Sequence, residues 1–223
     1  MTVRLRVLTW NLFHGRAVPA AGRELLAEFA AALAGWEWDV ALLQEVPPWW
    51  TGPLAFATGA AERHVLTSRN GLLRVRRAVA VRWPDLIRSN GGGCNAILVR
   101  GPQISEHRAA RLRRLPERRW LHAVRLDALW IANIHASGPD ADARRDCARA
   151  GATLLRWAAG TPALLGGDLN LRAPATPGFA LAGGSDVDHF LVARLRVAGA
   201  VELPERGALS DHRPVIVTVD SQP

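Results

Sequence analysis

The chain has 223 residues, of which 49% are hydrophobic and 22% are charged, and this composition excludes disordered and fibrous proteins. Its 28 basic residues outnumber its 20 acidic ones, so the net charge of +8 favours an anionic partner. Every basic residue is arginine and tyrosine is missing, which excludes mechanisms that need a lysine amine or a tyrosine phenol.

The first third of the chain alternates between strand and helix patterns. Apolar periodicity predicts a strand over Val3–Trp10, a helix over Gly22–Leu33 and a short strand over Val40–Leu43. The Pro- and Gly-rich stretch Pro47–Pro53 is predicted to be irregular, and Arg74–Trp83 fits neither pattern.

The rest of the chain contains several consecutive strands and one long helix. The helix is predicted over Ala141–Ala159. Strands are predicted over Asn95–Arg100, Ser105–Arg114, Trp120–Leu126, Leu129–His135, Ala163–Leu165, Val187–Ala193 and Val215–Val219. Consecutive strands require antiparallel pairing, whereas strand–helix–strand units require parallel pairing, so we expect an α/β fold with mixed sheets in a single domain over residues 1–223.

The cysteines and the length of the apolar runs indicate where in the cell the protein is expected. Cys94 and Cys147 form neither a metal-binding spacing nor a disulfide framework, and no run reaches the ~20 apolar residues of a membrane span. We therefore expect a cytoplasmic protein without a membrane span, and a monomer by default.

Polar side chains follow the predicted strands in a recurring pattern. Strands end near Asn11, Glu45, Asn133 and His135, Asp168 and Asn170, and Asp211 and His212. Strand ends in layered α/β proteins meet at one edge, where sites are built. Hard oxygen ligands suit Mg²⁺ or Mn²⁺, and imidazoles titrate near working pH. The pattern therefore predicts metal-assisted attack of water on a phosphate ester.

Six segments in order resemble the endonuclease/exonuclease/phosphatase superfamily, with its pancreatic-deoxyribonuclease-like fold. They are LTWNL (8–12), LLQEV (42–46), NIHAS (133–137), GGDLN (166–170), VDHFLV (187–192) and SDHRPV (210–215). The resemblance implies a four-layer sandwich, in which two packed mixed β-sheets are flanked by helices.

The same resemblance assigns the ligands of a metal ion. Glu45 matches the main ligand, Asn11 lies at the edge of the metal and nucleophile site, and Asp211 faces the metal. The implied cofactor is Mg²⁺ or Mn²⁺.

It also assigns the groups around the reacting phosphate. Asp168 is expected to hold or activate the attacking water, and Asn170 and His135 to contact the phosphate. His212 matches the imidazole that exchanges a proton with the nucleophile or stabilises phosphorane-like charge, and Asp188 the carboxylate that orients it.

Several basic and aromatic side chains are left without a firm role. Arg119 is the candidate for a phosphate-contacting arginine within a dense basic stretch that also contains Arg108, Arg111, Arg113, Arg114 and Arg118, most of which are expected on a solvated strand face. His14 either lines the site or lies on the surface. Trp49 and Trp50 either stack on a substrate base or pack the Pro-rich loop.

Two departures from the family narrow the expected activity. The abasic-site branch uses a tyrosine that this chain lacks, and His135 has no assigned acidic partner, Glu106 and Asp85 being the nearest acids. We expect a metal-dependent phosphodiester hydrolase, with nucleic acid as the favoured substrate. The alternatives are a phosphatase or phospholipase-type phosphodiesterase acting on small or lipid phosphates, and a catalytically silent protein that binds phosphate or nucleic acid on the same scaffold.

Overall fold

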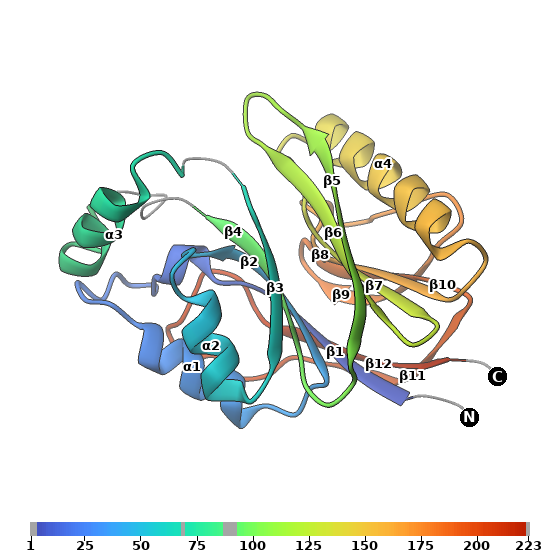
Figure 1. Ribbon diagram of the computed structural model, residues 1–223, viewed down its shortest axis with the longest axis horizontal. Coiled ribbons are helices and arrows are strands. Elements are labelled where there is room, and N and C mark those ends of the chain that lie inside the picture. The colour runs from blue at the N-terminus through green and yellow to red at the C-terminus, as the bar shows by residue number, and fades with distance from the viewer. Residues whose placement is uncertain (1–3, 68–69, 87–92, 222–223) are drawn as a thin grey trace.

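The computed structural model describes residues 4–67, 70–86 and 93–221, and these residues form two mixed β-sheets with helices on the outer faces (Figure 1). The predicted fold class is therefore confirmed. Within these residues, no helix is both long and apolar enough to cross a membrane.

The first sheet has six strands in the order β11-β12-β1-β2-β4-β3. Their bounds are Leu195–Glu202 (β11), Val215–Ser221 (β12), Arg4–Asn11 (β1), Val40–Val46 (β2), Cys94–Val99 (β4) and Ala61–Leu66 (β3). Only β1 and β2 pair in parallel in this sheet, because the crossover helix α1 (Leu26–Gly35) connects them.

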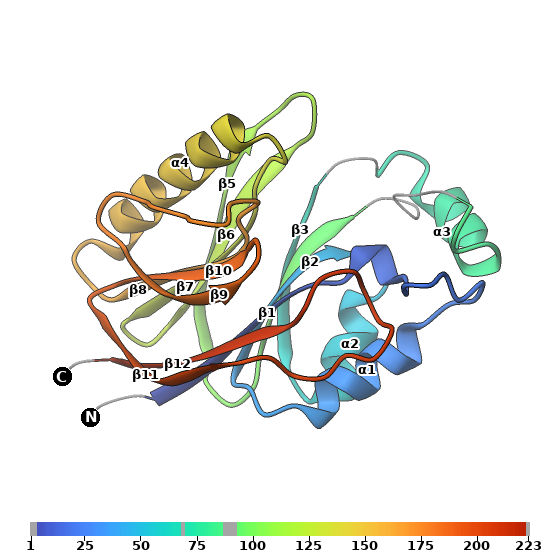
Figure 2. The ribbon, with the colours of Figure 1, turned by 180° about the vertical axis from the view of Figure 1, so that it is seen from behind.

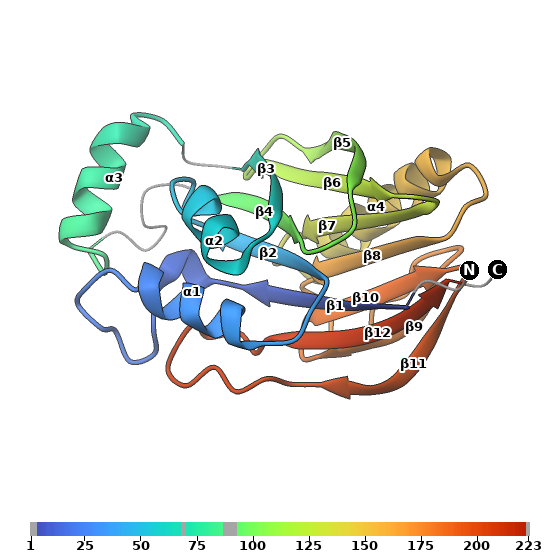
Figure 3. The same ribbon diagram turned by 60° about the horizontal axis from the view of Figure 1, so that its bottom comes forward.

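The second sheet repeats this arrangement, with the order β5-β6-β7-β8-β10-β9. Its strands are Ile104–Arg113 (β5), Arg119–Leu126 (β6), Leu129–His135 (β7), Ala163–Asp168 (β8), Asp188–Ala193 (β10) and Ala180–Ser185 (β9). The parallel pair is β7 and β8, which the long helix α4 (Asp140–Ala158) connects. The two sheets pack face to face, with β1 and β2 of the first against β7 and β8 of the second, and Figure 3 shows the strands of both sheets between α1 and α4.

Three apolar layers hold the sandwich together. One lies between the sheets and contains Val7, Ile131 and Phe190, all fully buried. A second lies under α1 and α2 (Thr51–Thr58) on the outer face of the first sheet. The third lies under α4, and Figure 2 shows this helix on the opposite outer side from α1 and α2.

Several elements differ from the predicted ones. Pro47–Pro53 was expected to be irregular throughout, but α2 begins at Thr51, because Pro53 lies in the first turn where its missing N–H costs no helical hydrogen bond. The ambiguous stretch after residue 72 forms a helix, α3 (Leu73–Arg82). Three edge strands, β3, β9 and β11, were missed because their partly exposed or Gly-rich sequences carry no regular apolar alternation.

Candidate functional site

The predicted site residues gather at one edge of the sandwich, where strands from both sheets end. Asn11 ends β1 and Glu45 lies one residue before the end of β2, both in the first sheet. His135 ends β7, Asp168 ends β8 and Asp188 begins the antiparallel β10, all in the second sheet. The register joins these last elements directly, because His135 and Asp188 both pair with Asp168.

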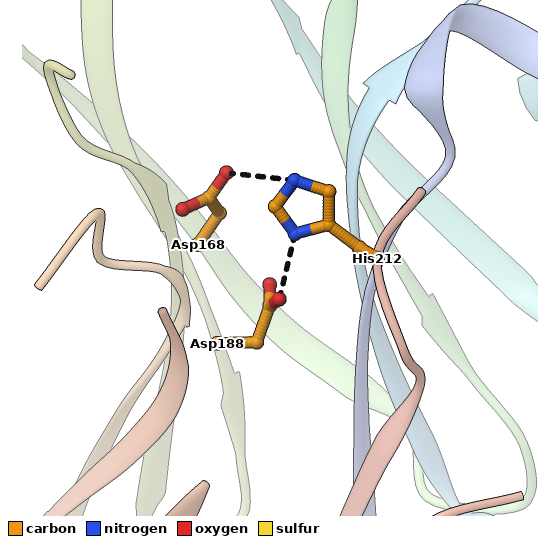
Figure 4. Close-up of side chains that lie close together, drawn as sticks. All are labelled: Asp168, Asp188 and His212. Atoms are coloured by element: carbon orange, nitrogen blue, oxygen red, sulfur yellow. Dashed lines mark hydrogen bonds and ion pairs between the residues drawn. The ribbon is translucent and has the colours of Figure 1, made fainter. Parts of the chain in front are cut away.

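His212 and Asp188 form a hydrogen-bonded pair across the two sheets. The Nδ1 atom of His212 lies 2.7 Å from Oδ2 of Asp188, and Nε2 points toward Asp168 at 3.9 Å (Figure 4). His212 precedes β12 of the first sheet, whereas both carboxylates belong to the second.

The loop that carries His212 is held by backbone contacts. Ser210 adopts a left-handed conformation with φ of 62° and donates from Oγ to the carbonyl oxygen of Asn11 at 2.6 Å. The His212 backbone N–H donates to the same Oγ, and the Trp10 indole N–H donates to the His212 carbonyl. The imidazole is therefore fixed in position at the end of β1.

The charge of this imidazole depends on its neighbours. Burial alone lowers the pKa of His212, but the hydrogen bond to Asp188 and the charges of Asp188 and Asp168 raise this pKa to about 9. Burial raises the pKa of Asp188 to about 6, while the bond to His212 acts in the opposite direction. Near neutral pH the pair is therefore an imidazolium beside a carboxylate.

Asp168 is buried and accepts hydrogen bonds from two asparagine residues. Its Oδ2 atom accepts from the Asn11 side-chain amide at 3.0 Å, and its Oδ1 accepts from the Asn170 backbone N–H at 3.0 Å. Burial raises the pKa of Asp168, whereas the charge of His212 and the Asn11 bond lower it. The Asn170 side chain donates to the Ala136 carbonyl at 3.0 Å from the left-handed turn after β8.

Glu45 faces two imidazoles, those of His135 and of His14, whose role the sequence alone does not assign. His14 Nε2 lies 3.1 Å from one Glu45 carboxylate oxygen, and His135 Nδ1 lies 4.0 Å from the other. His14 therefore lines the site, and its position three residues after Asn11, in a turn of positive φ, is the signal that could have found it. Burial, followed by the charge of Asp168, raises the pKa of Glu45 to about 7.

His135 has its acidic neighbours within the site itself. Its Nε2 atom lies 3.4 Å from Oδ2 of Asp168, and burial holds the pKa of His135 well below its usual range. Glu106 instead pairs with Arg108, and Asp85 with Arg16, so neither nearby acid serves His135.

Two sets of groups offer places for a divalent cation. One oxygen or nitrogen of Asp168, Asp188 and His212 lies within 4.8 Å of the others. In that set, however, His212 already bonds to Asp188, and a protonated imidazole has no lone pair to give a metal. Glu45 fits a cation better, because its half-buried carboxylate lies near the charge of Asp168 and a divalent ion would compensate both.

A cavity of about 510 Å³ opens beside the pair. Asn170, Asp188, Asp211 and His212 contribute to its lining, and Oδ1 of Asp211 lies 3.9 Å from Nε2 of His212. Asp211 is exposed and borders both the imidazole and this cavity. A ligand in the cavity can therefore reach the imidazole, the amide and both carboxylates.

The remaining candidates divide between the site and the core. Arg119 bonds to Glu117 at 2.7 Å, and its positive charge lowers the pKa of Glu45 and of Asp168, so it acts on the site. Asn133, in contrast, is buried between the sheets and accepts from the Gln44 amide at 2.8 Å. Trp50 is 2% exposed and packs on Phe29, which favours the packing role for this tryptophan.

Comparisons with known proteins agree with this fold. The sequence matches the profile of the "Endonuclease/Exonuclease/phosphatase family" over residues 8–212, and no curated protein matches it. A structure described as endonuclease/exonuclease/phosphatase from Beutenbergia cavernae is 20% identical, with a TM-score of 0.67 over 97% of this chain and 71% of that one.

Two further structures share the fold at lower identity. The endonuclease/exonuclease/phosphatase from Bacteroides vulgatus is 13% identical, with a TM-score of 0.74 over 99% of this chain and 100% of its own. TDP2 from Caenorhabditis elegans is 17% identical, with a TM-score of 0.68 over 97% of this chain and 74% of its own.

Proposed function

The chain belongs to the endonuclease/exonuclease/phosphatase family, and on that premise we propose that it hydrolyses phosphodiester bonds with the help of Mg²⁺ or Mn²⁺. The observation that carries the proposal is the meeting of Glu45, Asp168 and the His212–Asp188 pair at one edge of two sheets. Family members are generally hydrolases of phosphoric esters, and carboxylates, amides and imidazoles are the groups that such chemistry needs.

The imidazolium of His212 is the proposed donor to the phosphate. Its Nε2 is 3.9 Å from the Asp168 carboxylate, too far for a direct hydrogen bond but suited to a water or a phosphoryl oxygen between them. Asp188 holds the opposite nitrogen, which fixes the ring and keeps it charged.

Asp168 is the proposed acceptor for a proton of the attacking water. The Asn11 amide and the Asn170 backbone N–H fix its orientation, leaving lone pairs for the water. The water would attack in line with the leaving group, and the configuration at phosphorus would invert. The second N–H of the Asn170 amide, together with His135 and Arg119, would contact the non-bridging oxygens.

Glu45 is the proposed main ligand of the cation, with Asn11 and Asp211 at its border. A bound divalent ion supplies a Lewis acid that neutralises charge on the phosphate. His14 Nε2 lies 3.1 Å from a Glu45 carboxylate oxygen, so this imidazole would orient the carboxylate toward the cation.

Nucleic acid is the proposed substrate because the chain carries a net charge of +8. A small or lipid phosphate ester remains the alternative within the class, and a silent phosphate-binding protein the alternative outside it. The free, buried Cys94 and Cys147 agree with a reducing compartment, so the cytoplasm is the proposed location, with a monomer as the default state.

The test is hydrolysis of DNA, RNA, bis(p-nitrophenyl) phosphate and phospholipid in the presence of Mg²⁺. We expect wild type to cleave at least one, and His212→Ala and Glu45→Ala to lose roughly 10²–10⁴-fold in rate. His64→Ala and Glu37→Ala, both exposed and away from the site, are the matched controls. Equal rates for wild type and both site variants on every substrate would contradict the proposed roles.

A further inference from the structure

A second cavity, lined mainly by arginine, lies between the end of β5 and the first half of α4. Its volume is about 430 Å³, and we call it the arginine cavity. Its lining consists of Arg111, Leu112, Arg113, Arg114, Arg145, Asp146 and Arg149. Five guanidinium groups against the carboxylates of Asp146 and the adjacent Asp142 leave this hollow with a net positive charge.

Some of these arginines are held in place by acids of α4. Arg113 donates to Asp142 at 3.0 Å and lies 3.5 Å from Asp146, and Arg145 also pairs with Asp142. These ion pairs fix one wall of the cavity, and they compensate the positive charges of Arg113 and Arg145.

Three other arginines of the cavity are not compensated. Arg111, Arg114 and Arg149 are exposed and form no ion pair with any residue in the described part of the chain. Arg111 lies with its guanidinium carbon 6.0 Å from the Trp120 ring centre, which leaves its N–H groups available. Exposed guanidinium groups that converge on one hollow repel one another unless an anion joins them.

The arginine cavity lies at the same edge of the second sheet as the active site. β5 ends beside the start of β6, where Arg113 pairs with Arg119, and β6 starts beside the end of β7, which is His135. Two strand spacings therefore separate the backbones of Arg113 and His135, roughly 10 Å in all. Figure 1 shows the β5–β6 hairpin next to the first turns of α4 at this end.

A buried carboxylate connects the cavity to the strand that carries His135. Asp146 accepts from the Ser137 backbone N–H at 3.1 Å and from its hydroxyl at 2.6 Å, two residues beyond His135. The same carboxylate faces Arg113. The position of the cavity is thus fixed relative to the site.

We infer that the arginine cavity binds a second phosphate of a polynucleotide whose scissile phosphate lies at His212, an inference that rests on the proposed function. Guanidinium groups bind phosphate oxygens through paired N–H donors. A polynucleotide carries one phosphate at every nucleotide, so a short run of nucleotides that leaves the site past His135 brings a further phosphate to the cavity. A small ester with one phosphate cannot reach both places, so the cavity selects a chain of nucleotides.

The test compares two triple variants of equal charge. The first is Arg111→Gln with Arg114→Gln and Arg149→Gln. The control is Arg63→Gln with Arg125→Gln and Arg156→Gln, which removes three arginines bonded only to carbonyl or hydroxyl oxygens. Arg125 and Arg156 lie toward the opposite ends of β6 and α4.

Binding of a fluorescent 20-nucleotide single-stranded DNA is measured in EDTA over a range of salt. We expect the slope of log affinity against log salt to fall by about 0.7 for each lost phosphate contact, about 2 in all, in the cavity variant only. With Mg²⁺, its KM for the oligonucleotide should rise about tenfold at unchanged kcat, whereas hydrolysis of bis(p-nitrophenyl) phosphate should not change.

The possible failures are distinguishable. Equal salt slopes and KM values in the two triple variants would overturn the inference while leaving hydrolysis by wild type intact. The inference would also be overturned if wild type binds anionic phospholipid vesicles in preference to the oligonucleotide, and if the cavity variant loses vesicle binding while its oligonucleotide binding is unchanged. Oligonucleotide binding that depends on the cavity, in a wild type that cleaves no phosphodiester, would support the cavity and overturn the proposed function instead.

Discussion

At the scale of single residues, the behaviour of His212 is decided by its contacts. An isolated imidazole has a pKa near 6.5, and burial alone would lower it further. The bond of 2.7 Å to Asp188 and the nearby charge of Asp168 reverse this effect and raise the pKa to about 9. The same buried pocket raises the pKa of Asp188 to about 6, so neither group behaves as it would in water.

Replacing Asp188 by Asn is expected to lower kcat by roughly 10²–10⁴-fold, because the imidazole loses both its orientation and its charge. Without the carboxylate, the pKa of His212 falls, so the protonated ring is lost at lower pH than in wild type. The descending limb of the pH profile of kcat should therefore move to lower pH. Asp127→Asn, in the exposed turn between β6 and β7, is the control and should keep the wild-type profile. An unchanged profile in Asp188→Asn would contradict the role of this carboxylate.

At the scale of elements, close contacts between neighbouring strands set the position of the site. Gly167 directly precedes the candidate site residue Asp168 on β8, and its φ is 138°. A Cβ atom there would lie 1.9 Å from the Ile134 carbonyl oxygen on β7. Only glycine lets β7 and β8 approach closely enough to bring His135 beside Asp168.

Gly167→Ala is expected to reduce the free energy of unfolding by at least about 3 kcal/mol, since backbone strain and a backbone clash act together. Gly52→Ala, where an added Cβ meets nothing within 4 Å, is the matched control. Urea denaturation followed by circular dichroism measures both. Equal midpoints for the two variants would refute the close-approach explanation.

Where β3 of the first sheet meets β5 and β6 of the second, the structure buries another imidazole, that of His122, which is not among the predicted site residues. His122 is fully buried, and its Nδ1 lies 3.4 Å from His107 Nε2. Burial, followed by the charge of His107, lowers the pKa of His122 well below its ordinary value of about 6.5. Below pH 6.5 the unfolded chain takes up a proton that the folded chain excludes, so stability falls as pH decreases.

His122→Gln should therefore flatten the loss of unfolding free energy between pH 7.5 and pH 5, by up to about 1.4 kcal/mol per pH unit below 6.5. The comparison concerns slopes, so a uniform destabilisation by the substitution does not affect it. The measurement is urea denaturation at a series of pH values, and identical slopes for wild type and His122→Gln would exclude the buried imidazole as the cause.

At the scale of the whole molecule, the site bridges the two sheets. Glu45, Asn11 and His212 belong to the first sheet or the loop before its strand β12, whereas Asp168, Asp188 and His135 belong to the second. The apolar layer between the sheets brings these groups together. We propose that the chain is one cooperative domain, because neither half of the site exists without the other sheet.

Mg²⁺ is expected to raise the Tm, because it binds the folded site and not the unfolded chain. At a concentration of 100 times its Kd, the gain is about 2.7 kcal/mol, or about 5–10 °C for a chain of this size. Glu45→Gln should lose this response. Without metal at pH 8, it should melt above wild type, because the raised pKa of about 7 means that ionising Glu45 costs stability. Glu37→Gln is the exposed control in scanning calorimetry, and a full Mg²⁺ response in Glu45→Gln would exclude Glu45 as the main ligand.

The sequence by itself determined the fold class, and it predicted most of the residues that the structure brings together at the candidate site. Long apolar runs such as Leu129–His135 predict strands directly, and a polar side chain at the end of each run predicts a shared edge. Six ordered motifs added the family. These features are local, because the apolar pattern of a strand and the polar residue at its end lie next to each other in the sequence.

Only the tertiary structure decided which side chains meet. His14 faces Glu45, Asn133 turns into the space between the sheets, and the arginine cavity needs β5 and α4 to pack. The edge strands β3, β9 and β11 form because a neighbouring strand offers hydrogen bonds, which no pattern within those segments encodes. The physical reason is the same in each case: contacts between distant segments depend on packing and register, and these exist only once the chain has folded.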